Sequence, residues 1–379
     1  MIMRMFRGAM LGVIPCAVLA TTVAMGQSPK PRPAMDAIFK AFDTHSIVLL
    51  GEVHWNLQQH RFIQRLLRDP RLPAKVNDIA VEFGNSLYQP LIDRYIGGED
   101  VPLDSLRLVW RNNVVELAWD RTLYADFYAT VRAVNLKLPT PRRIRVIALD
   151  PPIDWRTMTS AERFPRLWGY RDPVWIQILD RESLSKGRTV LVIAGGLHIL
   201  RRDPPDFKPK PSDRFGLGDA LAQRYPDRVY SIYPAVGRGS IATLTRRWPE
   251  GSLADVKGTT LGARSSSVLW PSSVTMFRTV NGKPEPYTLQ ARDYPPIESL
   301  VDAILYYGPD ATLARLPSAN YWDCEYLAEL RRRNQLMLPV FGMDQRALID
   351  SLASHVMRAC PTASGGSRVP TMNPVVMAP

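Results

Sequence analysis

Four short and nearly continuous apolar runs recur over residues 47–194 of this chain, and an ionisable side chain follows each of them closely. Apolar runs without polar alternation are typical of strands that are covered on both faces, and such strands belong to parallel sheets. The runs are residues 47–50, 79–81, 144–149 and 189–194, and residues 229–233 are a candidate fifth strand. The sequence therefore predicts an α/β fold in which helices flank a mainly parallel β-sheet.

The segments between the runs have the spacing of helices. Residues 57–68 place apolar side chains three or four positions apart, which is the spacing of one helical face. A helix that runs back from one strand to the next makes the right-handed unit of a parallel sheet. Residues 35–42, 87–95 and 119–134 are further predicted helices, and between the last two we expect a loop or a helical insertion.

Beyond residue 235 the pattern is less regular, because Gly, Ser and Pro are frequent. Residues 300–307 have the composition of another buried element, so we expect residues 236–360 to extend the core domain of residues 35–235. A small second domain is the alternative. The low-complexity tail, residues 361–379, is expected to be disordered. Shorter predictions are a β-prone piece at 274–280 with a turn at Asn281-Gly282, and helices at 326–333 and 344–357.

The N-terminus has the pattern of a secretory signal peptide. Two arginines precede a mostly apolar stretch, residues 8–24, and a small-x-small cleavage site ends at Gly26. About 17 residues interrupted by Pro15 are few for the roughly 20 that span a membrane. We expect residues 1–26 to be cleaved, residues 27–34 to form a proline-rich linker, and the protein to be periplasmic or secreted. An uncleaved anchor helix is the alternative.

The formal net charge is +12, with the arginines scattered along the chain. No nucleic-acid-binding motif accompanies this charge, so we expect no nucleic-acid partner. Solvated surface charge is the leading explanation, and among partners an anionic envelope surface or an acidic ligand is favoured over DNA. Of the three cysteines, Cys16 would leave with the signal peptide. Cys324 and Cys360 can then form a disulfide or stay as free thiols. The sequence leaves this choice and the oligomeric state open.

The ionisable residues at the strand ends carry the functional prediction. In a parallel sheet the carboxyl ends of the strands lie at one edge, and ligands bind outside that edge. Acidic residues are depleted in strands and are unfavourable to bury, so several at one edge indicate a polar site. Each alone could instead cap a helix or bond within a loop. The predicted catalytic set is Glu52, His54, Glu82, Asp150 and His198.

The two histidines of this set share a local pattern. His54 follows Gly51 by three residues, and His198 follows Gly195 by three residues. Glycine lets the backbone leave a strand sharply or approach a ligand closely. His60 lies in the helix that follows the first strand, and we expect it on the flank of that helix, although the first turns of the helix could also face the site.

Two histidines and one or two carboxylates allow two kinds of chemistry. With His54, Glu82 and His198 as ligands they can hold a divalent metal, which lowers the pKa of a bound water. Without metal, a histidine that a carboxylate holds in one tautomer can act as a general base on water. In this second interpretation Glu52 and His54 activate or orient the water, and Asp150 fixes a histidine tautomer. Sequence patterns of other common catalytic sites are absent.

These motifs resemble those of the superfamily that joins ChaN-like haem-binding uptake proteins, Tiki-type metalloproteases and erythromycin esterases, and the ChaN-like branch is nearest. The resemblance covers residues 40–200, and a fainter similarity continues to residue 310. It implies an α/β fold and a functional set at the sheet edge. The residues that carry it are Gly51-Glu52-Val53-His54, His60-Arg61, Glu82, residues 91–98, residues 146–150 and Gly195-x-x-His198.

The resemblance leaves the activity open, because the superfamily contains haem binders, metal-dependent peptidases and metal-independent esterases. Haem ligation in the ChaN-like branch relies on a tyrosine, for which Tyr88, Tyr95 and Tyr124 are candidates in this chain. We expect an exported hydrolase that cleaves an ester, lactone or amide bond in a small molecule or peptide. The alternative is a non-catalytic carrier of haem or a metal at the cell envelope. A scaffold protein with a degenerate site is a third possibility.

Overall fold

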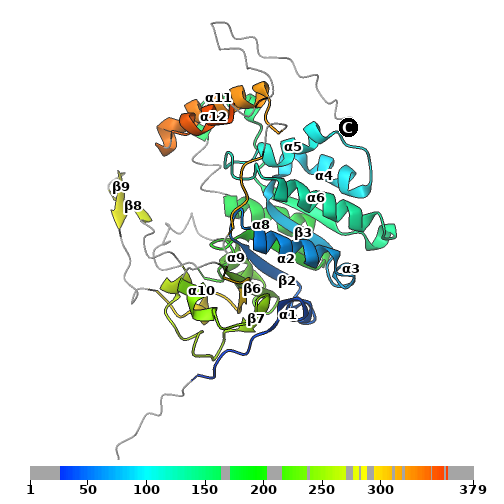
Figure 1. The fold of residues 1–379 in the computed structure, drawn as a ribbon, viewed down its shortest axis with the longest axis vertical. Coiled ribbons are helices and arrows are strands. Elements are labelled where there is room, and N and C mark those ends of the chain that lie inside the picture. The colour runs from blue at the N-terminus through cyan, green and yellow to red at the C-terminus, as the bar shows by residue number, and fades with distance from the viewer. Residues whose placement is uncertain are drawn as a thin grey trace, which may run out of the picture.

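The computed structural model describes the chain from residue 26 to residue 356 with gaps (Figure 1). In the described part, an eight-stranded sheet has the strand order β1-β7-β10-β6-β2-β5-β3-β4. Helices cover both faces of this sheet, so the predicted α/β class is confirmed. The described residues are 26–163, 171–202, 216–236, 240–269, 276–280, 283–287, 294–309, 312–317, 321–342, 344–353 and 356.

Six strands of the sheet are parallel, and they include all five strands that the apolar runs predict. The chain order of these six is β2 (Ile47–Glu52), β3 (Asp78–Asn85), β4 (Arg145–Asp150), β5 (Val190–Gly195), β6 (Val229–Ala235) and β10 (Ala303–Tyr306). At the other edge, β7 (Ser252–Asp255) pairs antiparallel with β10, and β1 (Arg32–Pro33) pairs antiparallel with β7. The strands β7 and β10 thus bring the segment after residue 235 into the same sheet.

The two faces of the sheet bury different side chains. Along β2, Val48 and Leu50 lie in the core on one face, and Ile47 and Leu49 lie in the core on the other. All four are fully buried, which explains why the strand is apolar without alternation. The first face is covered by α1 (Ala34–Ala41), α2 (Leu57–Arg68), α3 (Leu72–Lys75), α4 (Gln89–Gly97), α5 (Leu103–Arg111) and α6 (Thr122–Asn135), and the second by α8 (Arg171–Glu182), α9 (Leu217–Arg224) and α10 (Ser240–Thr245).

The remaining elements lie away from the sheet. The helices α11 (Cys324–Phe341) and α12 (Arg346–Ala353) pack together beyond α5, and β8 (Met276–Val280) pairs with β9 (Lys283–Tyr287) in a separate ribbon (Figure 1). Short 3-10 helices connect many of these elements: η1 (Ser86–Tyr88), η2 (Thr140–Arg142), η3 (Trp155–Thr157), η4 (Ala161–Arg163), η5 (Leu184–Lys186), η6 (Ser266–Leu269) and η8 (Ile297–Ser299).

Several predicted boundaries differ from the structure. Residues 27–34 were expected to be only a linker, but β1 and the first residue of α1 lie within them, because the edge strand β7 offers unpaired backbone groups. The helix expected at 326–333 is part of the longer α11. Cys324 begins that helix and is disulfide-bonded. Residues 1–25, Cys360, the turn at Asn281-Gly282 and the tail at 361–379 lie outside the described residues.

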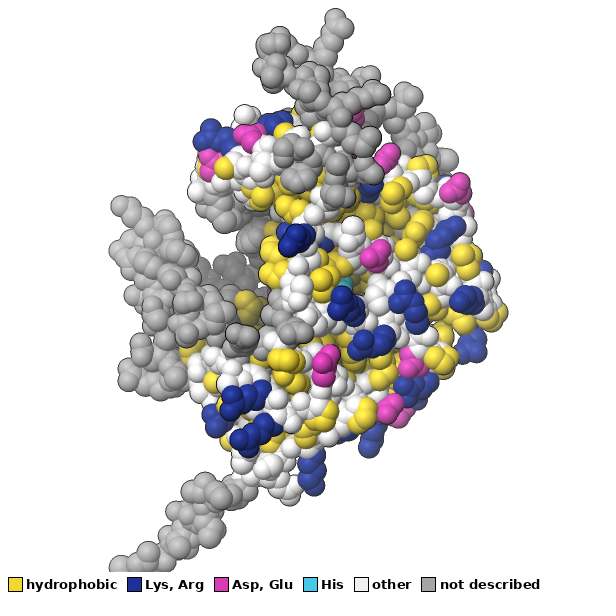
Figure 2. All heavy atoms as spheres, viewed as in Figure 1, with side chains coloured by type: hydrophobic (Ala, Val, Ile, Leu, Met, Phe, Trp, Pro, Cys, Tyr) yellow, Lys and Arg dark blue, Asp and Glu magenta, His cyan; other side chains and the backbone are white. Residues whose placement is uncertain are grey.

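The described surface carries its positive charge in a dispersed form. On the face drawn in Figure 2, Lys and Arg side chains are spread among Asp and Glu side chains and do not form one block. In the part of the chain that the structure describes, no helix has the length and apolar character needed to cross a membrane.

Helix α9 packs directly on the loop that follows β5. The backbone N–H of Gly218 donates to the carbonyl oxygen of His198, at 2.8 Å. A Cβ atom at position 218 would lie 2.5 Å from the backbone oxygen of Leu200 and from the carbonyl carbon of Ile199. Only glycine therefore allows α9 to support the His198 loop at this distance.

We predict that Gly218→Ala lowers the free energy of unfolding by about 1–3 kcal/mol, because the added methyl group forces the helix and the loop apart. Urea unfolding followed by circular dichroism measures this change. Gly97→Ala is the matched control, since nothing lies within 4 Å of a Cβ at that helical position. The control should be neutral or stabilising by up to about 1 kcal/mol, and equal losses in both variants would contradict the packing argument.

Candidate active site

The strand order brings the five predicted site residues to one edge of the sheet. The strands β2, β5, β3 and β4 are consecutive neighbours, and their carboxyl ends lie side by side. Glu52 and Gly195 are partners in the register of β2 and β5. The register of β3 and β4 shifts between Val81 and Asn85, an irregularity that contains Glu82. The positions at this edge are those expected from the sequence, whereas the contacts between the side chains differ in part.

The first loop is held rigidly against the start of α2. Asn56 caps this helix by accepting from the backbone N–H of Gln59 at 2.8 Å. The Gln59 amide in turn donates to the carbonyl oxygen of Gly51 and accepts from the N–H of Val53. Trp55 between them has a φ of 67°, a conformation that is unfavourable for a non-glycine residue and persists only where the surroundings enforce it. These contacts set the direction in which His54 leaves the strand.

Glu52 is a buried carboxylate that contacts two histidines. Its Oε1 accepts from the Tyr124 hydroxyl at 2.8 Å and lies 2.8 Å from His60 Nε2, and its Oε2 lies 3.4 Å from His54 Nδ1. Burial alone would raise the pKa of Glu52, but the contacts with the histidines outweigh burial and hold that pKa well below its usual range. Burial would lower the pKa of His54, and the Glu52 carboxylate outweighs it and raises the pKa to about 9.

The expectation that His60 lies on the flank of its helix is wrong. Its side chain is 4% exposed and faces Glu52. The sequence contained a signal for this, because His60 shares a helical face with Ile63 and Leu67, which are both buried in the core under α2. A polar residue on the inward face of an amphipathic helix requires a buried partner, and Glu52 supplies it.

The second part of the site is an ion-pair network around Arg171. This guanidinium donates to Glu82 Oε1 at 2.9 Å and to Asp150 Oδ1 at 3.0 Å. Glu82 Oε2 also accepts from the backbone N–H of Gly195, and Asp150 Oδ2 accepts from that of Val114, both at 2.7 Å. Burial would raise the pKa of Glu82, but the charges of His198 and Arg171 outweigh it and lower that pKa.

These contacts correct the role expected of Asp150. It was predicted to fix the tautomer of a histidine, but it contacts Arg171 and the Val114 N–H instead. The carboxylate next to His198 is Asp172, whose Oδ1 lies 2.7 Å from the His198 Nδ1. Burial would lower the pKa of His198, and the charges of Asp172 and Glu82 outweigh it and raise the pKa.

Helix α8 supplies the residues that sequence reasoning missed. Arg171 and Asp172 stand in its first turn, and Trp175 follows one turn later, with its ring centroid 4.6 Å from that of His198. An arginine and an aspartate at the start of a helix are ordinary in a basic chain, so their residue types gave no signal. Only the packing of α8 beside β4 and β5 reveals that they belong to the site.

The His54 ring and the Glu82 carboxylate converge over Gly195. A Cβ atom at that position would lie 3.1 Å from His54 Nε2 and 3.3 Å from Glu82 Oε2. The His54 side chain is 38% exposed and that of His198 26%, whereas the Glu52 and Glu82 carboxylates are at most 2% exposed. The groups that a bound molecule can reach are therefore the imidazoles, and the buried carboxylates set their orientation and charge.

The arrangement does not fit the predicted metal set. Among the described residues, no group of three or more His, Cys, Asp or Glu side chains is placed to hold a metal ion. Glu82 is paired with the Arg171 cation, and Asp172 faces His198 Nδ1. A second cation beside Arg171 would meet charge repulsion. The metal stays a prediction that elemental analysis can test, and no catalytic step below passes through it.

Haem likewise stays a prediction. Of its three candidate tyrosines, Tyr124 is fully buried and donates to Glu52. The Tyr88 hydroxyl accepts from the Asn112 amide at 2.8 Å, and the Tyr95 ring lies under the Arg132 guanidinium.

Comparisons with known proteins confirm the fold. A solved structure described as a succinoglycan biosynthesis protein aligns with a TM-score of 0.50 and 11% identity, over 76% of this chain and 96% of that one. This chain shares its fold. At 11% identity, this likeness concerns the fold alone. No protein-family model and no curated protein matches the sequence.

Two further solved structures align over a similar share of the chain. A protein from Bacillus cereus has a TM-score of 0.48 and 11% identity, over 77% of this chain and 97% of that one. An erythromycin esterase mutant in its open conformation has a TM-score of 0.45 and 11% identity, over 74% of this chain and 94% of that one.

We predict that Gly195→Ala changes the site with little effect on stability. The new methyl group would meet His54 and Glu82 at 3.1–3.3 Å, so these side chains must move by a few tenths of an ångström. A crystal structure of the variant should show both displaced, and the melting temperature should stay within a few degrees of the original. Unmoved side chains would contradict the close convergence described above.

Proposed function

We propose that this protein is a hydrolase that cleaves an ester, lactone or amide, with His198 as the general base and His54 as the general acid. The observation that carries this proposal is the placement of two reachable imidazoles around one buried carboxylate, each with an acidic partner on its Nδ1 side. The Nε2 atom of each ring is then the one that can transfer a proton, and that of His198 lies 3.8 Å from Glu82 Oε1, beyond hydrogen-bond distance.

His198 is the proposed general base. With Asp172 at Nδ1, the Nε2 atom of the neutral ring can accept a proton from water while the resulting imidazolium is stabilised by the carboxylate. The water oxygen then bonds to the carbonyl carbon of the substrate, and the carbonyl π electrons move to its oxygen. The negative charge of Asp172 favours this proton transfer because it raises the pKa of His198.

His54 is the proposed general acid. Its pKa of about 9 keeps it positively charged at neutral pH, so it can stabilise the oxyanion of the tetrahedral intermediate. When the carbonyl reforms, the bond to the alcohol or amine breaks, and His54 gives its proton to that leaving group. His198 then releases to solvent the proton that it took from water, and His54 takes up a proton from solvent. These two exchanges restore the starting state. Glu52 and Glu82 hold the imidazolium in place by charge.

The signal-like pattern predicted at the N-terminus supports the proposal that this reaction takes place outside the cytoplasm, and we propose small molecules or peptides as substrates. A panel of ester, lactone and amide substrates is therefore the appropriate activity screen. Addition of haem in the same experiment, with absorbance measured for a saturable Soret band, tests the carrier alternative.

We predict that His54→Gln and His198→Gln each lower kcat by about 10²–10⁴-fold, the usual contribution of a general acid or base. His45→Gln is the matched control, because His45 precedes β2 and lies at the opposite end of that strand. Melting temperatures separate a catalytic loss from unfolding. Turnover retained in both site variants would overturn the assignment.

We predict a bell-shaped dependence of kcat/KM on pH. Activity should rise as His198 loses its proton, above the usual histidine pKa of about 6.5 because the His198 pKa is raised. It should fall near pH 9 as His54 loses its proton. In Glu52→Gln the alkaline limb should move to lower pH, because the carboxylate that raises the His54 pKa is gone. An activity that keeps increasing through pH 9 would contradict the acid role of His54.

A further inference from the structure

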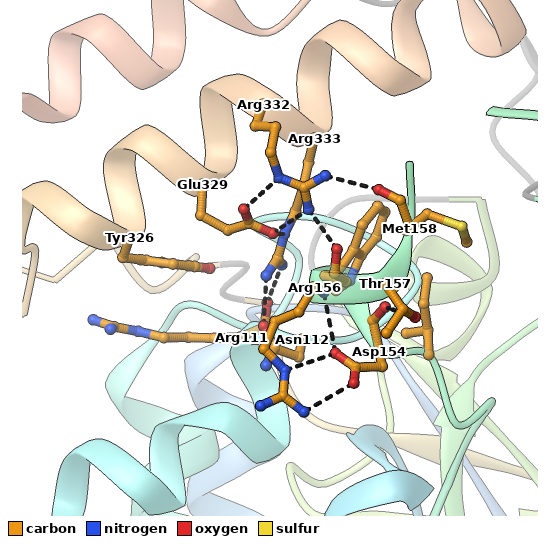
Figure 3. A network of polar contacts seen from close by, with 12 residues as sticks. Arg111, Asn112, Asp154, Arg156, Thr157, Met158, Tyr326, Glu329, Arg332 and Arg333 are labelled. Carbon is orange, nitrogen blue, oxygen red and sulfur yellow. Dashed lines mark hydrogen bonds and ion pairs between the residues drawn. The ribbon is translucent and has the colours of Figure 1, made fainter. Parts of the chain in front are cut away.

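Helix α11 joins two loops that belong to the active-site edge of the sheet. Arg332 donates to the carbonyl oxygens of Trp155 and Met158, at 2.5 and 2.8 Å, in the segment that follows β4 (Figure 3). Arg333 donates to the carbonyl oxygen of Arg111 and to the Asn112 side chain, at 2.9 and 2.6 Å, at the end of α5.

Two further observations show that these contacts are built into the protein. Glu329, one turn earlier in α11, accepts from both arginines at 2.6 and 2.8 Å (Figure 3). The Arg333 side chain is only 3% exposed. Charged hydrogen bonds of a buried arginine are worth more than those of surface ion pairs, because water does not compete for them.

The two loops are also bonded to each other and to β3. The Trp155 indole donates to the Asn113 carbonyl oxygen at 3.1 Å. The Asn85 amide, at the end of β3, donates to the carbonyl oxygens of Asn112 and Ile153, at 2.7 and 2.8 Å. The helix, both loops and the strand therefore form one connected unit.

A short path leads from this unit to the proposed catalytic groups. Two residues after Asn112, the backbone N–H of Val114 donates to Asp150. Asp150 holds the Arg171 guanidinium, and Arg171 holds Glu82. A displacement of the loop at Asn112 thus reaches the carboxylate that lies between the two histidines.

A second path reaches His54 from the same helix. The hydroxyl of Tyr326 donates to Asp120 Oδ2 at 2.8 Å, and that of Tyr321, just before α11, donates to Asp120 Oδ1 at 2.5 Å. Asp120 is adjacent in sequence to Trp119, whose ring meets the His54 ring edge-on with centroids 4.8 Å apart. The C-terminal segment thus contacts the surroundings of both histidines through different residues.

We propose that α11 is a positioning element of the active site. Arg333 positions the Arg171–Glu82 ion pair through the loop at Asn112, and Tyr326 positions His54 through Asp120 and Trp119. This inference deepens the proposed hydrolase function, and its kinetic readout rests on that function. Neither residue contacts the reacting groups, so both act through the loops that they hold. Displacements well below 1 Å at a catalytic group are enough to change rates, since a misplacement of 1 Å can cost about 10²-fold.

The test compares three conservative variants of the full-length protein. Arg333→Lys keeps the charge but loses the fork that reaches two acceptors. Tyr326→Phe removes one hydroxyl. Arg331→Lys is the matched control, because Arg331 lies two residues before Arg333 on the same helix but pairs with Asp350 of α12 at the surface. We expect kcat to fall about tenfold or more in the first two variants, with a smaller change in KM, and to stay unchanged in the control.

A substrate-independent readout is the pair of imidazole resonances of His54 and His198 in proton–carbon NMR spectra at a fixed pH. We expect Arg333→Lys to shift mainly the His198 resonance and Tyr326→Phe to shift mainly the His54 resonance, with neither shifted in Arg331→Lys. If Arg333→Lys does not fold, Tyr326→Phe tests the same claim at His54.

Two outcomes overturn the positioning role. One is that the folded variants lose only melting temperature and retain the original kcat and both resonances. The other is that the control shifts the resonances as much as they do. If the selective shifts appear but the original protein hydrolyses no substrate of the panel, the positioning role holds and the hydrolase proposal fails.

Discussion

The active-site edge depends on one buried cation that joins two carboxylates. Glu82 and Asp150 are at most 2% exposed, and the Arg171 guanidinium bonds to both. Two carboxylates in a region of low dielectric repel each other and would take up protons without a cation between them. The planar fork of arginine fits this task, because it can donate to two acceptors at once. Loss of one partner from such a buried network typically costs about 3–5 kcal/mol.

The histidines take their properties from this network. The Glu82 charge acts on both histidines, and each histidine has one further carboxylate beside it, Glu52 for His54 and Asp172 for His198. The two rings therefore differ in environment although their sequence motifs are alike. His54 lies in a loop that α2 holds on one face of the sheet, and the His198 ring contacts α8 on the other face. The site is thus made jointly by the two helical layers.

The segment after residue 235 does more than lengthen the chain. The strands β7 and β10 widen the sheet away from the site. The helix α11 returns to the carboxyl edge, where its arginines replace the water that would otherwise bond to the loop carbonyls. The same carbonyl groups would be unsatisfied beneath an apolar helix, which explains why Arg332 and Arg333 point inward.

The sequence by itself determined the α/β class, the parallel strands and the five ionisable residues at their ends. It could do so because strands buried on both faces have an apolar pattern that is local, and because polar residues at the ends of such strands stand out. The sequence also indicated that His60 shares a helical face with Ile63. It did not indicate that Glu52 is the polar partner of His60.

Only the tertiary structure decided which side chains meet at that edge. The order β2-β5-β3-β4 places strands that are distant in sequence side by side, and no local pattern encodes that order. It gave Asp150 an arginine partner in place of a histidine and brought Asp172 to His198. Arg171, Asp172 and Arg333 look like surface residues in the sequence, because charged side chains reveal their role only through the partners that burial selects.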